Sequence, residues 1–350
     1  MRIAVAMSGG VDSSVVAGLM AEQGHEVVGL TLQLYDGTAG RRGSCCAGRD
    51  IADARAVADR LGIAHYVIDA QARFRDAVIQ DFADSYARGE TPVPCVRCNM
   101  TVKFTDLLAI AQDAGAQALA TGHYVQRIEG AEGPELHRAA DPARDQSWFL
   151  FATTPAQLAY ARFPLGDMPD KTAVRAHASR LGLAVADKPD SQDICFVPDR
   201  DYAAMVERLR PDAAGPGELV TADGQVVGQH LGVAHYTVGQ QRGLGPASFG
   251  GGVRQSVLAV DGATRRIVIG PRSAGSTRLV LRDVNWLVAP VPSLACTVKL
   301  RAREAPHPAV VRQSGGVVTV ELPKPALAAP GQGCVFYDGA RVLGGGFISV

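Results

Sequence analysis

The sequence predicts an α/β domain built on a parallel sheet, followed by two small β-rich domains, of which the last is a β-barrel. Strand-like and helix-like segments alternate from residue 2 to residue 120. After residue 201, glycine and proline cluster and short β-branched runs replace the helical pattern. Alternation of this kind is typical of a parallel sheet, and short runs bounded by turns are typical of small barrels. We expect the domains to span residues 1–202, 203–272 and 273–350.

The first domain is predicted from apolar periodicity. Strands are expected at Arg2–Met7, His25–Leu34, Ala64–Ile68 and Ala116–Ala120, and helices from Asp12 to just before Gly24, at Asp50–Leu61 and at Phe104–Ala114. Gly24 and Gly62 stand just past two of these helices, where glycine commonly ends a helix. Strands separated by helices need crossover connections, which make neighbouring strands parallel.

The second half is predicted from turn residues and short apolar runs. Turns are expected at Gly215–Gly217 and Gly243–Gly252, and strands at Ser256–Val260, Arg266–Ile269, Cys296–Leu300 and Val317–Leu322. We place the seam between the two β-rich domains near Arg272–Arg282.

Composition narrows the class of protein. The chain has 350 residues, of which 47% are hydrophobic and 20% charged, so it is an ordinary globular protein. No apolar run reaches the length of a membrane-spanning helix, and the N-terminus reaches Gly9 too soon for a secretory signal. Seven cysteines, an odd number, do not suggest a disulfide scaffold. We therefore expect a cytoplasmic protein.

The charge balance is neutral, with 35 basic and 35 acidic residues. A nucleic-acid partner usually brings a basic excess, but a local basic patch is sufficient. The basic residues are mostly arginine, and lysine occurs at positions 103, 171, 188, 299 and 324. We attribute this bias to codon usage.

A glycine-rich loop follows the first predicted strand. It runs from Met7 to Ser14 and opens a helix. Two glycines allow a tight turn that aims backbone N–H groups at an anion, while Ser8 and Ser13 add hydroxyl donors at a helix N-terminus. The loop has neither the lysine of a Walker loop nor the spacing of a dinucleotide fingerprint. The pattern favours ATP phosphates and resembles the pyrophosphatase loop of enzymes that transfer AMP to a substrate oxygen.

Three cysteines are candidates for chemistry. Cys95 and Cys98 form a Cys-x-x-Cys pair, and Cys195 lies far along the chain. Such a pair can be half a zinc site, a redox pair or part of a cluster ligand set. We predict no zinc site, because no second pair stands at suitable spacing.

Several stretches together resemble the tRNA-specific 2-thiouridylases. They are Ser8–Ser14, Thr91–Phe104, Ala120–Tyr124, Arg144–Ser147, Asp190–Phe196, Tyr236–Leu244 and the tail from Pro330 to Gly346. The resemblance covers nearly the whole chain in order. It implies an adenine-nucleotide α-hydrolase-like catalytic domain and ATP-dependent 2-thiolation of the wobble uridine (U34) of tRNA. It also implies an upstream persulfide sulfur-donor protein as partner. We expect Mg²⁺ to accompany ATP, because departing pyrophosphate must be neutralised.

The resemblance also carries over site residues. It implies that Cys98 is the nucleophile and Cys195 the persulfide carrier. The ATP site would include Ala6, Met7, Ser8, Gly9, Gly10, Val11, Asp12, Ser13, Leu32 and Gly122. The tRNA would contact Val93, Pro94 and Cys95 near the target base, Arg144, Asp145 and Gln146 in a loop, and Arg301 and Ala302 in the last domain.

The chain departs from the family pattern at a few positions. Val93 stands where asparagine is usual, Cys95 where some relatives have aspartate, Gln241 where arginine is common and Ala302 where tyrosine is typical. Because position 95 is a cysteine, an alternative route uses an iron–sulfur cluster held by Cys95, Cys98 and Cys195. 

Two other functions compete with thiolation. An amide-forming ligase with the same loop needs an ammonia source, and the chain has no room for a glutaminase domain. A non-catalytic RNA-binding module would not require an intact Ser8–Ser13 loop together with two cysteines in matching contexts.

Overall fold

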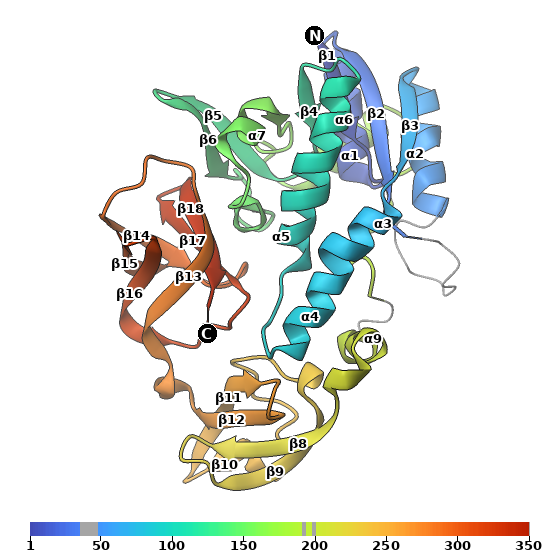
Figure 1. Ribbon diagram of the computed structural model, residues 1–350. Helices are drawn as coiled ribbons and strands as arrows, with labels where there is room; N and C mark the ends of the chain where they lie inside the picture. Colours follow the sequence, from blue (N-terminus) through green and yellow to red (C-terminus); the bar gives the residue numbers. More distant parts are fainter. Residues whose placement is uncertain (36–47, 191–193, 198–200, 350) are drawn as a thin grey trace. The chain divides into compact units, whose positions relative to one another are not determined.

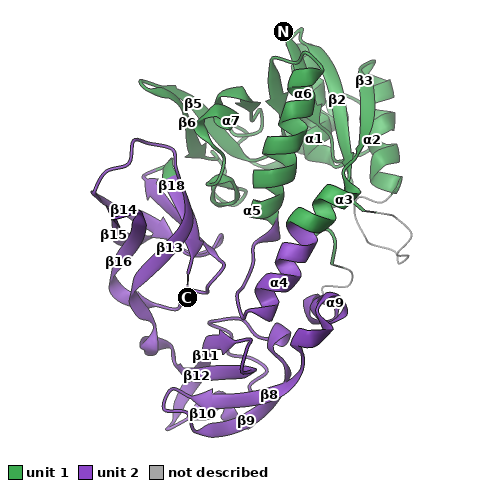
Figure 2. Cartoon of the chain, viewed as in Figure 1, with its two compact units in different colours: residues 1–77, 95–200, 340–343 green, residues 78–94, 201–339, 344–350 purple. Residues whose placement is uncertain are grey.

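The computed structural model describes residues 1–35, 48–190, 194–197 and 201–349 (Figure 1). The chain forms two compact units (Figure 2). Unit 1 contains residues 1–77, 95–200 and 340–343, and unit 2 contains residues 78–94, 201–339 and 344–350. The chain therefore passes into unit 2 at Val78, returns to unit 1 at Cys95, the first residue of the Cys-x-x-Cys pair, and enters unit 2 again at Asp201 and Gly344.

Unit 1 is built on the predicted parallel sheet. The strands lie in the order β3-β2-β1-β4-β7, with parallel pairing between all described neighbours. They are β1 (Arg2–Ala6), β2 (Glu26–Gln33), β3 (Ala64–Asp69), β4 (Ala118–Ala120) and β7 (Ala161–Arg162). The first four were predicted, whereas β7 was not, because two residues are too few to show a periodicity.

Helices pack on both faces of this sheet. Ile3 and Val5 of β1 belong to a core shared with α1 (Val11–Glu22), α2 (Gly48–Leu61) and α8 (Lys171–Arg180). Ala4 belongs to a second core shared with α6 (Leu108–Asp113). Successive strand residues point to opposite faces, so a continuous apolar run suits a strand that is covered on both sides.

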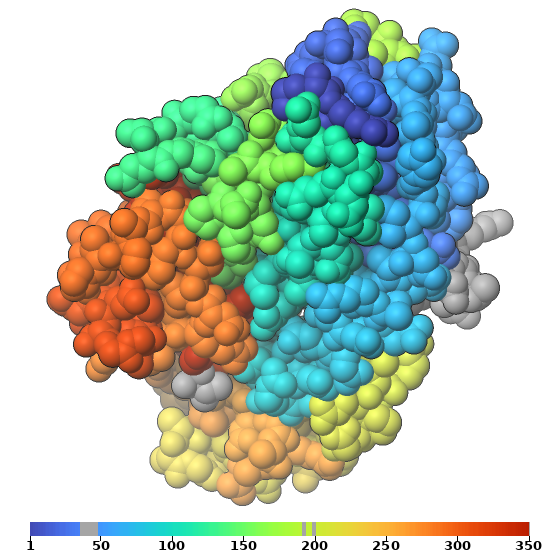
Figure 3. Space-filling model, turned by 45° about the horizontal axis from the view of Figure 1, so that its top comes forward, coloured from blue at the N-terminus to red at the C-terminus, as the bar shows by residue number. Residues whose placement is uncertain are grey.

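A long helical stretch carries the Cys-x-x-Cys pair. It consists of α5 (Pro94–Cys98), a π-helical segment (Asn99–Leu107) and α6. The sequence-based prediction began this helix at Phe104 and was wrong at that end. Pro94 suits the first helical turn, because its fixed φ is already helical and its missing N–H is not needed there. Figure 3 shows the outer side of this stretch (teal) at the molecular surface.

The structure adds several short elements that the sequence analysis did not predict. They are α3 (Gln71–Phe74), a π-helical turn (Arg75–Gln80), α4 (Asp81–Ala87), the hairpin β5 (Val125–Gly130) and β6 (Gly133–Arg138), α7 (Pro155–Tyr160) and α9 (Tyr202–Leu209). Thr154 and Gln157 form a capping box at the start of α7, which satisfies two backbone N–H groups.

The first part of unit 2 is a small five-stranded sheet. Its strands are β8 (Ala214–Thr221), β9 (Val226–Gly232), β10 (Phe249–Gly250), β11 (Val253–Asp261) and β12 (Arg266–Pro271), in the order β10-β11-β12-β8-β9. The predicted strands at Ser256–Val260 and Arg266–Ile269 fall within β11 and β12. Leu219, Val257 and Ile267 form the centre of its core.

The second part of unit 2 contains a closed six-stranded barrel, as predicted. The strands are β13 (Ser276–Trp286), β14 (Ser293–Lys299), β15 (His307–Ser314), β16 (Val317–Ala326), β17 (Gly333–Asp338) and β18 (Arg341–Ile348). They pair in the order β13-β16-β15-β14-β17-β18, and β18 pairs again with β13, which closes the barrel. Val298, Val320 and Phe336 are fully buried in it. Among the described residues, no helix is both long and apolar enough to cross a membrane.

Candidate active site

The loop after β1 has the geometry of an anion-binding loop. Gly9 has a φ of 73°, which glycine adopts without strain. The Ser8 backbone N–H donates to Ser13 Oγ at 3.1 Å, and the two serine hydroxyls lie 3.2 Å apart. The N-cap residue of α1 is Gly10, which has no side chain to cap the first turn. The backbone N–H groups and the positive end of this helix can therefore bind phosphate.

Close backbone approaches bring Gly122, which the resemblance assigned to the ATP site, to this loop. A Cβ atom built on Gly122 would lie 3.0 Å from Ser13 N and 3.1 Å from Asp12 Cβ. A Cβ atom on Gly9 would lie 2.1 Å from the carbonyl oxygen of Asp50. Any larger side chain at either glycine would displace the loop.

Met7 and Leu32 lie at the carboxyl ends of neighbouring parallel strands. Met7 N donates to Leu30 O at 2.8 Å, and Thr31 Oγ1 donates to Met7 O at 2.7 Å. These bonds fix the start of the phosphate loop against β2. Leu32 follows Thr31 directly and is half-buried, beside the end of the sheet where ligands bind in open α/β folds.

Lys188 binds one side of the loop. Its ammonium donates to Gly9 O at 2.9 Å and to Asp50 Oδ1 at 2.6 Å, and it pairs with Asp53 Oδ2 at 2.5 Å. An ammonium has three N–H donors, so this arrangement uses all of them. The loop is thereby tied to the first turns of α2.

Lys171, the first residue of α8, binds the other side. Its ammonium lies 2.7 and 2.8 Å from the two carboxylate oxygens of Asp12 and 2.8 Å from Asp190 Oδ1. Tyr124 donates its hydroxyl to Asp12 Oδ1 at 2.6 Å, and Arg144 pairs with Asp190 Oδ2 at 2.7 Å. A chain of charges therefore joins the phosphate loop to the Arg144 loop.

The electrostatic environment keeps these groups in one protonation state. Burial raises the pKa of Tyr124, and the hydrogen bond to Asp12 raises it further, so the phenol remains a donor. Burial opposes ionisation of Asp190, but Lys171 and Arg144 outweigh it and lower its pKa. Burial likewise disfavours charged Lys188, but its bonds to Asp50 and Asp53 outweigh it and raise its pKa. All three states hold at neutral pH.

Asp145 and Gln146 make hydrogen bonds that stabilise their own loop. Asp145 Oδ1 accepts a hydrogen bond from Ser147 N at 3.0 Å, and Gln146 Oε1 accepts one from Tyr124 N at 3.0 Å. Arg144 remains more than a third exposed. Asp145 and Gln146, by contrast, use side-chain oxygens to accept hydrogen bonds from nearby backbone N–H groups.

Cys98 is buried at the last residue of α5. Burial raises the pKa of its thiol, and the nearby positive charge of Lys103 partly opposes this effect. Lys103 donates to Asn99 Oδ1 at 3.1 Å, and Asn99 Nδ2 donates to Phe149 O at 3.1 Å. The sequence analysis named no role for Lys103.

The other two cysteines lie in different surroundings. Cys95 is exposed and Cys195 is half-buried. Tyr35 donates its hydroxyl to the carbonyl oxygen of Cys195 at 2.9 Å. Within the part of the chain that the structure describes, no three Cys, His, Asp or Glu residues are grouped to hold a metal ion. Cys95, Cys98 and Cys195 therefore do not form a ligand set for an iron–sulfur cluster here, and that alternative has no geometric support.

The residues predicted to contact tRNA from unit 2 are mostly engaged within that unit. Arg301 Nη2 donates to Val238 O at 3.0 Å and to Leu327 O at 3.2 Å. Ala302 O accepts a hydrogen bond from Lys299 at 2.6 Å. Val93 and Pro94 are buried. Arg301 thus joins the small sheet to the barrel, in addition to any contact with RNA.

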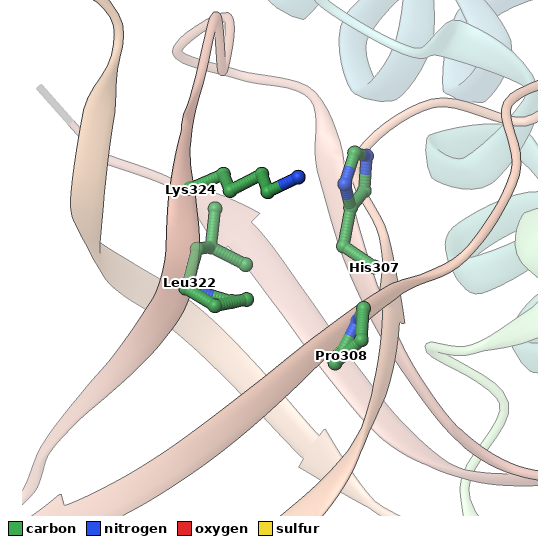
Figure 4. Close-up of a pocket in the computed structure, with 5 residues that line it drawn as sticks. His307, Pro308, Leu322 and Lys324 are labelled. Carbon is green, nitrogen blue, oxygen red and sulfur yellow. The ribbon is translucent and has the colours of Figure 1, made fainter.

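The barrel also carries a small, largely apolar pocket (Figure 4). It is lined by His307, Pro308, Leu322, Pro323 and Lys324 from β15 and β16. None of these residues was predicted to act in the site, and the lining has no acidic or thiol group. We assign it no role in the chemistry.

Models of known families match the chain in three consecutive parts. A model described as "tRNA methyl transferase HUP domain" matches residues 1–199. Models described as "tRNA methyl transferase PRC-barrel domain" and "Aminomethyltransferase beta-barrel domain" match residues 204–271 and 276–348. The fold and the loop thus define a HUP-domain protein with two appended β domains.

The relatives are more specific. The tRNA-specific 2-thiouridylase MnmA of Acidiphilium cryptum is 65% identical over 99% of this chain and 100% of that protein. The MnmA proteins of Gluconobacter oxydans and Rhodospirillum centenum are 63% and 60% identical, over 100% and 99% of this chain and 99% and 91% of their own. The chain belongs to the family of tRNA-specific 2-thiouridylases.

Sequence analysis missed Lys171 and Lys188 as parts of the site. Both lie far in sequence from the residues that they bind, so no local motif joins them. One feature of the sequence could have drawn attention to them: lysine is rare in this chain and occurs at five positions only. Where arginine dominates, a lysine indicates a place that suits a compact ammonium better than a planar guanidinium.

Proposed function

We propose that the protein catalyses ATP-dependent 2-thiolation of the wobble uridine (U34) of tRNA. One observation carries this proposal: Gly122 packs against a phosphate loop of the kind that binds ATP, and the same chain contains Cys98 and Cys195. The relatives named above are all called tRNA-specific 2-thiouridylases, whereas the family models carry a methyl-transferase description. Because the loop resembles the pyrophosphatase loop of adenylating enzymes, it favours 2-thiolation over methyl transfer.

In the first step the uracil O2 attacks the α-phosphorus of ATP. A P–O bond to O2 forms, and the bond to pyrophosphate breaks. We propose that residues Ala6–Ser13, Leu32 and Gly122 hold ATP, with backbone N–H groups of the loop stabilising the leaving pyrophosphate. Mg²⁺ would travel with the nucleotide and share its charge. Lys171 and Lys188 hold the loop in shape from its two sides.

In the second step sulfur replaces the activated oxygen. The Cys98 thiolate attacks Cys195 Sγ of a Cys195 persulfide, so that a Cys98–Cys195 disulfide forms and hydrosulfide leaves with the electron pair. Hydrosulfide then adds at C2, and AMP departs with the former O2. Alternatively the terminal persulfide sulfur attacks C2 directly and Cys98 resolves the adduct. Both routes end in a disulfide that an external thiol must reduce.

Cys98 is the last residue of α5 and is followed directly by the π-helical segment Asn99–Leu107. Lys103 is the cation that lowers the Cys98 pKa, against the larger effect of burial. We therefore propose that Cys98 stays protonated until tRNA and the persulfide are in place.

The domains would divide this work. We propose that residues 1–202 adenylate and thiolate, that residues 203–272 form a central β-rich domain, and that residues 273–350 form a barrel domain that contacts tRNA through Arg301 and Ala302. Val93, Pro94 and Cys95 would approach the target base, and Arg144 and Arg301 the RNA backbone. An upstream persulfide protein would load Cys195, in the cytoplasm where tRNA and thiol reductants are both present.

The deciding experiment measures 2-thiouridine in tRNA after incubation with purified protein, ATP, Mg²⁺ and a persulfide sulfur donor. Wild type is compared with Cys98→Ser, Cys195→Ser and Cys95→Ser, each prepared with and without air. We expect ATP-dependent product from aerobic wild type, and its loss in the first two variants only.

Other outcomes point elsewhere. Activity only in anaerobic, iron-loaded protein, lost also in Cys95→Ser, would favour a cluster route. ATP cleavage without a thionucleoside would indicate an adenylating enzyme with another substrate. Binding of tRNA should weaken steeply with salt because phosphate contacts release counterions, and a flat response would contradict an RNA substrate.

A further inference from the structure

Glu90, which is buried, and Arg282, which is about one-third exposed, form a bidentate ion pair within unit 2. Arg282 Nη1 and Nη2 donate to the two carboxylate oxygens of Glu90 at 2.6 and 2.9 Å, and Glu90 is only 5% exposed. Arg282 belongs to β13 of the barrel, whereas Glu90 follows α4. The hydrogen bond from Arg282 lowers the pKa of Glu90, so the carboxylate is ionised at neutral pH.

The next residue is also bound to the barrel. Thr91 N donates to Pro330 O at 2.7 Å, and Gln332 Nε2 donates to Thr91 O at 3.0 Å. Gly331 has a φ of 85°, and a Cβ atom on it would lie 3.1 Å from Glu90 Cβ and from Thr91 O. Only glycine allows this approach. The connection between β16 and β17 therefore satisfies both backbone polar groups of Thr91.

The residues before this point are held by the small sheet of unit 2. A Cβ atom on Gly89 would lie 2.2 Å from Val260 O, and one on Gly262 would lie 1.9 Å from Ala87 O. Arg210 pairs with Asp84 at 2.6 Å. The segment from Asp84 to Thr91 therefore contacts both β-rich parts of unit 2.

This anchored segment leads directly to Cys95 and Cys98. Only Pro92, Val93 and Pro94 separate Thr91 from Cys95. Each proline fixes its own φ and restricts the residue before it, so this connection has little freedom to absorb a displacement. The position of the anchor thus constrains where α5 begins.

We propose that Glu90 and Arg282 are a positioning pair for Cys98: the barrel fixes the chain from which the helix bearing this cysteine starts. The inference rests on the proposed role of Cys98 in sulfur transfer. A bidentate guanidinium–carboxylate pair sets orientation as well as distance, which a lysine in place of Arg282 would not reproduce. Neither residue touches substrate in this proposal.

The test compares Arg282→Lys with Arg312→Lys. Arg312 pairs with Glu321 on the same barrel, but both side chains are about half exposed, so it is a matched control. Four quantities are measured on the full chain: the thermal midpoint, the tRNA dissociation constant, the single-turnover rate of 2-thiouridine formation, and the rate of Cys98 alkylation by iodoacetamide, located by mass spectrometry. Arg282→Met is a stronger second variant.

We expect Arg282→Lys to slow single-turnover thiolation by about 10- to 100-fold, because small misplacements of a reacting group have large effects on rate. Affinity for tRNA should change by less than about threefold, and alkylation of the buried Cys98 should quicken by about fivefold or more as its helix loosens. Arg312→Lys should match wild type in all four measurements.

Two results would overturn the proposal. One is unchanged thiolation in Arg282→Lys. The other is a loss of turnover equal to the loss of tRNA affinity with Cys98 alkylation unchanged, which would make the pair a support for RNA binding alone. If wild type forms no 2-thiouridine, the proposed function fails, and the alkylation comparison still decides whether the pair positions Cys98. If Arg282→Met does not fold, Arg282→Lys decides.

Discussion

Lys188 donates a hydrogen bond of 2.9 Å to the carbonyl oxygen of Gly9, the residue at which the phosphate loop turns. The same ammonium binds Asp50 and Asp53 of α2. Gly9 in turn lies against the backbone of Asp50. The shape of a glycine loop near the N-terminus thus depends on a lysine 179 residues further along the chain.

Replacing Lys188 by arginine should therefore weaken ATP binding. A planar guanidinium keeps the charge but cannot direct three donors to three oxygens converging on one point. We expect the ATP dissociation constant to rise about tenfold, which corresponds to about 1.4 kcal/mol. Calorimetric titration measures it, with Lys324→Arg on the exposed side of the barrel as control. Equal ATP affinity in Lys188→Arg and wild type would contradict this role.

Tyr124→Phe tests the other side of the loop. It removes the hydroxyl that donates to Asp12 Oδ1 at 2.6 Å and leaves the buried ring. We expect a loss of about 1 kcal/mol in unfolding free energy. We also expect slower tRNA-dependent exchange of pyrophosphate into ATP, since Asp12 is then held by Lys171 alone. Tyr66→Phe is the control, because Tyr66 is 58% exposed on β3 and should change neither quantity. Equal rates of pyrophosphate exchange in Tyr124→Phe and Tyr66→Phe would show that the Tyr124 hydroxyl does not contribute to adenylation.

The sequence predicted the parts of this site that are local in the chain. The run Arg2–Met7, the two glycines after it and Asp12 specify a strand, a turn and a helix within one continuous segment, and the structure has all three. Gly122 was added by resemblance, and the structure places it against Ser13. The barrel was predicted from short β-branched runs and closes as expected.

What the sequence could not predict depends on contacts between distant segments. Lys171 meets Asp12 and Asp190 through the tertiary fold, and no periodicity or motif encodes such a meeting. The start of the helix at Pro94 was missed because the run Pro94–Cys98 gives no amphipathic pattern. Arg301 was expected to contact RNA. Its hydrogen bonds to two backbone carbonyl groups could not be predicted, because they form only where the small sheet and the barrel meet.

The reactivity of Cys98 should depend on pH in a defined direction. Burial raises the pKa of its thiol above the ordinary value of 9.0, so the thiolate is scarce at neutral pH. In protein without tRNA, the rate of Cys98 alkylation should still be rising at about pH 9. Lys103→Met removes a nearby positive charge and should slow alkylation about threefold or more at a given pH. Lys324→Met is the matched control, and a rate that levels off below about pH 8 would contradict the raised pKa.

The last prediction concerns the stability of the Glu90–Arg282 pair. Arg282 lowers the pKa of Glu90 below its ordinary value of 4.5, so between the folded and unfolded pKa values the unfolded chain binds more protons. The stabilisation from this carboxylate is therefore complete above about pH 5 and is lost as pH falls through the folded pKa.

We expect Glu90→Gln to lower the unfolding free energy by about 2 kcal/mol at neutral pH, since it leaves a partly buried guanidinium without its counter-charge. Urea unfolding of both proteins from about pH 7 to about pH 3 should show this gap narrowing below about pH 4, as wild-type Glu90 itself becomes neutral. Glu321→Gln, which breaks an exposed pair on the same barrel, should differ from wild type by less than about 1 kcal/mol throughout. The absence of a gap at neutral pH would mean that Glu90 acts through its shape, because a glutamine has the same size and lacks only the charge that Arg282 binds. A gap that stays constant down to the lowest pH would contradict the lowered pKa of Glu90 as its cause.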